Sequence, residues 1–143
     1  MKPGDSPGDL FDGLASCLLR ENALPELSAD KTDIKELTKL FRETPKAAVP
    51  LIKGGLSQAA SEVAKNEQLE EQPNARLVLV IDQMEEMFSL ESITHEQRIK
   101  FIEALDTLAR SGRVWVIATL RSDFYPGCTE LEILVELRGK PST

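Results

Sequence analysis

The sequence LVLVI at residues 77–81 is an unbroken apolar run that ends at Asp82, and VWVIA at residues 114–118 is a second such run that ends at Thr119. Short apolar runs without alternation are typical of parallel strands whose two faces are both covered by helices. We therefore predict an α/β protein with a small parallel sheet. Its strands, at about 77–82 and 114–119, should be flanked by helices in three layers.

The segment between the two runs carries the signals of a helix. Thr94 is followed three residues later by Gln97, which is the pattern of a capping box, and Gly112 marks the end of the helix. A strand, a helix and a second strand in this order form a βαβ unit. We place this unit at residues 75–126.

Residues 1–66 are predicted to be mostly helical. Apolar residues between Asp9 and Leu19 recur at helical spacing. A second helix is predicted over about 30–43, with Asp30 or Thr32 as its cap.

Helix-breaking residues interrupt the next segment, residues 45–66. Pro50 and the pair Gly54-Gly55 predict breaks there, before a helix resumes at Leu56.

The remaining segments are a loop and a tail. Residues 67–74 are polar and acidic and end near a proline, which predicts an exposed loop. Residues 127–143 are predicted to form a C-terminal helix, at about 130–137, and a tail. The 143 residues suffice for one domain and are too few for two ordinary ones.

Composition excludes several classes of function. Acidic residues outnumber basic ones by 24 to 17, which gives a net charge of −7. Nucleic acids and anionic membranes attract basic surfaces, so we expect neither as a partner. No apolar run approaches the roughly 18 residues that span a bilayer. The two cysteines, Cys17 and Cys128, lack metal-ligand spacing, and we expect a reducing, cytoplasmic setting.

The end of the first apolar run carries candidate catalytic residues. Functional groups of open α/β sheets gather beyond the carboxyl ends of the strands. Asp82 stands there and could hold Mg²⁺, while Glu85 or Glu86, one helical turn onward, could activate a water molecule. A purely structural interpretation also fits, because Asp82 and Glu85 have the spacing of a capping box.

The end of the second run carries candidate phosphate-sensing residues. Thr119 and Arg121 could present a hydroxyl and a guanidinium to a γ-phosphate, and the fork of an arginine matches phosphate oxygens. Alternatively, Arg121 could form a surface ion pair with Asp123, which would contribute little.

The two strand ends together resemble a known family. LVLVIDQMEEMF at residues 77–88 and VIATLRSDFYP at residues 116–126 are similar to the ATPase domain of STAND-class signal-transduction NTPases, in the bacterial branch often fused to WD-repeat propellers. The opening KPGDSP at residues 2–7 resembles the R-P-G-x-x-P segment that follows the second strand of that family. The stretch 31–72 matches only in its helical, variable character.

The resemblance implies roles for the candidate residues. Asp82 would be the Mg²⁺ ligand, and Glu85 or Glu86 the water-activating acid, with Glu85 slightly preferred. Thr119 and Arg121 would be the sensor at the end of the neighbouring strand. The implied fold is part of a P-loop NTPase domain, and the nucleotide, ATP or GTP, would act as a switch.

One family motif is missing. The phosphate-binding pattern G-x-x-x-x-G-K-[ST] occurs nowhere in the 143 residues, and Lys53-Gly54-Gly55 does not replace it. We therefore expect one partial NTPase domain whose parent binds ATP and Mg²⁺, while this chain alone binds ATP weakly or not at all and is inactive. The resemblance implies the P-loop half and a winged helix as partner domains of the parent, and a WD propeller if the parent belongs to the branch that carries one.

Two further expectations concern interactions. A narrow sheet leaves open edges and uncovered surfaces, so we expect the chain to self-associate. The competing interpretation is a degenerate α/β scaffold that binds partner proteins and hydrolyses no nucleotide.

Overall fold

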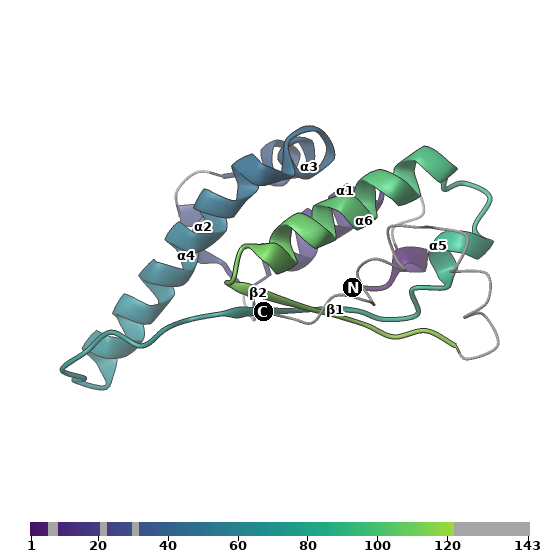
Figure 1. The fold of residues 1–143 in the computed structure, drawn as a ribbon. Coiled ribbons are helices and arrows are strands. Elements are labelled where there is room, and N and C mark those ends of the chain that lie inside the picture. Colours follow the sequence, from purple (N-terminus) through teal and green to yellow (C-terminus); the bar gives the residue numbers. More distant parts are fainter. Residues whose placement is uncertain (6–8, 21–22, 30–31, 122–143) are drawn as a thin grey trace.

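A computed structural model describes residues 1–121 except 6–8, 21–22 and 30–31. The helices of residues 3–66 precede the first strand, and two further helices lie between the first strand and the second (Figure 1). In chain order the elements are η1 (Pro3–Asp5), α1 (Leu10–Leu18), α2 (Glu26–Ala29), α3 (Ile34–Glu43), α4 (Pro45–Asn66), β1 (Leu77–Ile81), α5 (Glu86–Ser89), α6 (His95–Arg110) and β2 (Val114–Ala118). The predicted helix at 130–137 lies outside the described residues.

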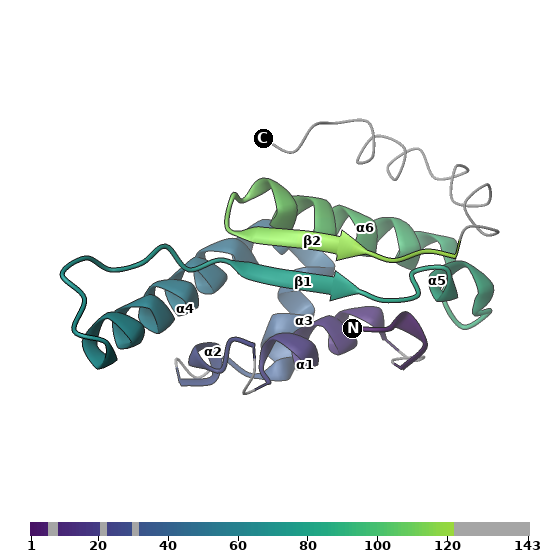
Figure 2. The same cartoon turned by 90° about the horizontal axis from the view of Figure 1, so that it is seen from below.

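The predicted parallel strands are confirmed. β1 and β2 pair in parallel from Leu77 opposite Val114 to Ile81 opposite Ala118. The two strands lie side by side in Figure 2 and point the same way. Their carboxyl ends, which carry Asp82 and Thr119, therefore meet at one edge of the sheet.

Helix ends are fixed by local side chains. The predicted capping box of α6 is present: the Thr94 hydroxyl accepts from the Gln97 N–H, and the Gln97 side chain accepts from the Thr94 N–H. In α3 the cap is Asp33, whose carboxylate accepts from the Glu36 N–H at 2.7 Å. The prediction of a cap at Asp30 or Thr32 was wrong because the helix starts later, at Ile34.

The predicted breaks in residues 45–66 are absent. α4 is one helix of 22 residues that continues through Pro50 and both glycines. Pro50 removes a single N–H donor near the start of the helix. Gly55 permits α2 to pack closely, since a Cβ there would lie 3.2 to 3.4 Å from side-chain atoms of Leu24 and Leu27. Tertiary packing therefore outweighs the local propensity to break.

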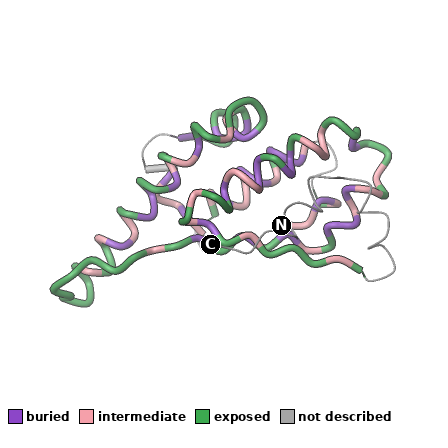
Figure 3. Tube along the Cα trace, viewed as in Figure 1, coloured by how far each residue is buried: buried purple, intermediate pink, exposed green. Residues whose placement is uncertain are grey.

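The helices enclose one apolar core. The rings of Phe11 and Phe101 meet edge to face, with centroids 5.8 Å apart, and both side chains are buried. Leu79 and Ile81 close the core from the side of the sheet, and Phe41 contributes from α3. The buried residues of Figure 3 follow this interior, between the helices and the sheet.

Among the described residues, helices cover only one face of the sheet. In Figure 1 the long helices lie above β1 and β2, and Figure 2 looks directly onto the opposite face. That face exposes four large apolar side chains: Val78, Val80, Trp115 and Ile117. Within the described part of the chain the fold is thus mostly helical with two layers, and the predicted cover on the second face is not seen there.

Met1 pairs with the edge of β1 that faces away from β2. The Met1 amino group donates to the Val80 carbonyl at 2.8 Å, and the Asp82 N–H donates to the Met1 carbonyl at 2.7 Å. This pair of bonds is the pattern of a parallel bridge between Met1 and Ile81. The edge of β1 opposite to β2 is therefore partly occupied at its carboxyl end.

Residues 67–74 are all exposed and, with the end of α4, project away from the sheet.

No helix among the described residues combines the length and the apolar character needed to cross a membrane.

Candidate functional site

The candidate residues of the two strand ends form a direct contact. Asp82 follows β1 and Thr119 follows β2, and the Thr119 hydroxyl donates to Asp82 Oδ1 at 2.7 Å. Parallel pairing brings these positions together because both strands end at the same edge. A bond to a carboxylate is charge-assisted and stronger than one between neutral groups.

Thr119 also holds the turn that follows Asp82. Its hydroxyl accepts from the Gln83 N–H at 2.9 Å, and its carbonyl accepts from the Met84 N–H at 2.9 Å. Gln83 has a φ of +56°, in the left-handed region that non-glycine residues rarely adopt. The bonds from Thr119 stabilise this strained turn.

The structural alternative for Asp82 does not form. A capping box would require a helix to start directly after Asp82, with the carboxylate accepting from the Glu85 N–H. Instead the Asp82 carboxylate accepts from Thr119, and α5 begins only at Glu86, with Glu85 at the N-cap position. The hydrogen bond from Thr119 to Asp82 therefore forms in place of a capping-box bond from the Glu85 N–H.

The two glutamates have different surroundings. Glu85 is buried, at 8% exposure, and its Oε2 has no hydrogen-bond partner among the described residues. The Glu86 carboxylate is partly exposed and accepts from the Gly4 N–H at 2.6 Å. The neighbouring acids are thus not equivalent: the main chain of η1 engages one of them and not the other.

Arg121 is exposed and lies beyond Thr119, three residues after the end of β2. Its alternative partner Asp123 lies outside the described residues.

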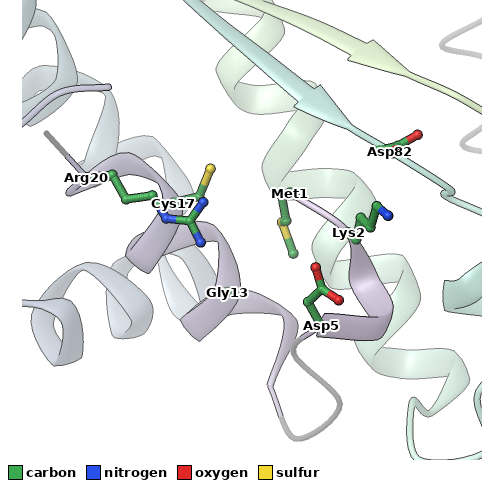
Figure 4. A pocket seen from close by; sticks show the side chains of 7 residues that line it. All are labelled: Met1, Lys2, Asp5, Gly13, Cys17, Arg20 and Asp82. Carbon is green, nitrogen blue, oxygen red and sulfur yellow. The ribbon is translucent and has the colours of Figure 1, made fainter. Parts of the chain in front are cut away.

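A pocket of about 220 Å³ adjoins Asp82 on the side of η1 and α1 (Figure 4). Its walls carry both signs of charge, with Lys2 and Arg20 opposite in sign to Asp5 and Asp82. The complete lining is Met1, Lys2, Asp5, Gly13, Cys17, Arg20 and Asp82. Sequence reasoning missed Lys2 and Arg20 as lining residues of the pocket that Asp82 borders, because only the fold brings the first residues and the segment after α1 to this place.

The residues at the strand ends fit part of a magnesium site. Mg²⁺ commonly takes one or two protein carboxylates and completes its shell with water and substrate phosphates. Asp82 could supply one carboxylate to such a site, and the Thr119 hydroxyl, which donates to it, would hold its orientation. In the described part of the chain no group of three or more His, Cys, Asp or Glu side chains could hold a metal without such additional ligands.

Comparison with known proteins identifies the family. Neither a curated protein nor a solved structure matches this chain. The family Novel STAND NTPase 1, or nSTAND1, matches residues 5–141, nearly the whole sequence and both strand ends described above. The chain, with its parallel strands ending in Asp82 and Thr119, therefore belongs to the Novel STAND NTPase 1 family.

Proposed function

We propose that this chain supplies the Walker B strand and the sensor strand of a STAND-type signal-transduction ATPase, in which the bound nucleotide acts as a switch. Membership of the nSTAND1 family supports the class of protein. The observation that supports the assignment of the strands is the 2.7 Å hydrogen bond between the Thr119 hydroxyl and Asp82. It joins the two positions from which such a switch would bind Mg²⁺ and detect phosphate.

Asp82 is proposed as the Mg²⁺ ligand, with Thr119 and Arg121 as the sensor. A threonine hydroxyl has one proton and can donate it to one acceptor at a time. Here that acceptor is Asp82, and the same hydroxyl oxygen holds the Gln83 N–H. A γ-phosphate that competes for the hydroxyl would thereby change the restraint on the turn after β1. This coupling is how a local phosphate contact would reach the rest of the domain.

Glu85 is proposed as the acid that polarises the attacking water. A general base needs an oxygen that can accept a proton, and Oε2 of Glu85 has no hydrogen-bond partner among the described residues. Glu86 fits this role less well because its carboxylate already accepts from Gly4.

Nucleotide binding also requires a phosphate-binding loop, which the 143 residues do not contain. Backbone N–H groups and a lysine of that loop supply most of the phosphate cradle in P-loop proteins. We therefore place ATP and Mg²⁺ binding in a polypeptide that joins this chain to such a loop. A winged helix and a WD propeller are the further partner domains that we propose for it.

The test has two parts. Calorimetry with Mg-ATP and Mg-GTP on the 143-residue chain should detect no micromolar binding, and micromolar affinity would contradict the need for an added loop. In the full-length protein, Asp82→Asn should lower turnover on the order of a hundredfold, because a ligand of the catalytic metal is lost. Asp12→Asn, at an exposed position of α1, is the matched control.

The sensor is tested in the same protein with a pair of variants. Thr119→Val removes the hydroxyl and should weaken Mg-ATP binding by about 10- to 100-fold, whereas Thr119→Ser keeps the hydroxyl and should bind nearly as wild type. Arg121→Ala should abolish the nucleotide-dependent change of state, and His95→Ala should not. If Asp82→Asn and Thr119→Val both behave like the Asp12→Asn control, the chain is a scaffold and the switch proposal is wrong.

A further inference from the structure

We infer that Glu86 is a positioning residue, whose carboxylate binds the main chain of Gly4 and thereby clamps the segment Met1–Asp5 onto the turn that carries Asp82. The assignment of roles to the two glutamates rests on the proposed function. The clamp itself rests on contacts that involve no nucleotide.

The contact between Gly4 and Glu86 is close and specific. The Gly4 N–H donates to Glu86 Oε2 at 2.6 Å, a charge-assisted bond between residues 82 positions apart. A Cβ on residue 4 would lie only 2.4 Å from the same oxygen and 2.9 Å from its carboxyl carbon. Glycine is therefore the residue that allows the carboxylate to approach the main chain here.

The preceding residues complete the clamp. Pro3 is buried, and the Asp5 N–H donates to the Lys2 carbonyl at 3.1 Å, which closes the turn of η1. Met1 then reaches the edge of β1, where its carbonyl accepts from the Asp82 N–H at 2.7 Å. One short segment thus binds both ends of the stretch 82–86: the main chain at Asp82 and the side chain at Glu86.

Thr119 holds the same stretch from the opposite side. It contacts Asp82, Gln83 and Met84 through its hydroxyl and its carbonyl. The strained Gln83, with its positive φ, lies between these two sets of bonds. Both sets restrain the turn, and backbone strain persists only where the surroundings over-determine it. Glu86 therefore acts on Asp82 through the Met1–Asp5 segment.

Amide hydrogen exchange of the 143-residue chain, measured by NMR, tests the clamp. In Glu86→Ala, the Gly4 and Asp82 amides should exchange on the order of tenfold faster, since a charge-assisted bond is lost at one and its support at the other. Glu86→Gln keeps a carbonyl acceptor and should recover part of the protection. Glu91→Ala removes a nearby exposed acid and should change neither amide.

A reciprocal variant covers the case in which Glu86→Ala does not fold. Gly4→Ala places a methyl group where the carboxylate lies and should accelerate exchange at Asp82 without altering α6. The inference fails if the Asp82 amide is unchanged in Gly4→Ala, or if the Gly4 amide shift and exchange are the same in Glu86→Ala and wild type. It also fails if Glu86→Gln restores nothing. These readouts need no nucleotide, so their failure leaves the roles of Asp82 and Thr119 untouched.

Discussion

The two faces of the β1–β2 sheet have nearly the same composition and opposite environments. On the covered face, Leu79 and Ile81 are buried beneath the helices, with 3% and 0% exposure. On the face that no described helix covers, here called the bare face, Trp115 and Ile117 are 57% and 48% exposed, although they belong to an equally apolar run. Alternate residues of a strand point to opposite faces, so each run contributes to both environments. Burial in this sheet is decided by the position of the helices and not by the hydrophobicity of the residue.

The largest effect should come from a matched pair of isoleucines on the two faces. Ile81→Ala leaves a cavity in the core and should lower the free energy of unfolding by about 2–5 kcal/mol. Ile117→Ala removes the same atoms from the bare face and should cost well under about 1 kcal/mol, because no enclosed cavity forms. Urea denaturation of both variants measures the difference. Equal losses would mean that the bare face is covered in solution.

A smaller effect is expected from the same contrast within α4. A Cβ on Gly54 meets no atom within 4 Å, so Gly54→Ala should stabilise the chain by about 0.5–1 kcal/mol through helix propensity. At Gly55 a Cβ would press on Leu24 and Leu27, and Gly55→Ala should lose that gain. Thermal unfolding measures the change in stability of each variant, and so compares the exposed Gly54 with the buried Gly55. A larger gain at Gly55 than at Gly54 would show that α2 is not packed closely against α4.

The smallest change in stability should follow from Trp115→Ser, although its effect on association should be clear. We expect a second copy of the chain to cover the bare face at high concentration, because a contiguous exposed apolar patch is unfavourable in water. Trp115→Ser should change the free energy of unfolding of the monomer by less than about 0.5 kcal/mol and shift sedimentation toward the monomer. Asp12→Asn, at an exposed position of α1 and outside the apolar patch, serves as a neutral surface control. A wild-type chain that sediments as a clean monomer at all concentrations would contradict the expected association.

The candidate site was predictable to the extent that it depends on parallel pairing. Once two apolar runs form adjacent parallel strands, the residues that follow them must meet at one edge, and Asp82 and Thr119 do so. The different surroundings of Glu85 and Glu86 could not be predicted, because the partner of Glu86 is Gly4, which lies 82 positions earlier in the sequence. No local pattern links positions so distant in the sequence.

In the fold, too, features set by neighbouring residues were predictable and features set by distant contacts were not. The capping box at Thr94 and Gln97 involves residues three positions apart, and it formed as predicted. α4 is continuous and packs at Gly55 against Leu24 and Leu27, which lie far away in the sequence, so Gly54-Gly55 misled a prediction based on propensity alone. The exposure of Val78 and Val80 likewise depends on which face the helices cover.

The amino-acid sequence by itself determined the strands, the caps of α6 and the family, because these follow from neighbouring residues and from motifs at the strand ends. The tertiary structure alone decided which face of the sheet the described helices cover, how Gly4 binds Glu86, and which residues line the pocket beside Asp82. The physical reason is the separation in sequence between the residues that interact. Hydrogen bonds within a turn need only local geometry, whereas packing and contacts between distant segments exist only after the chain has folded.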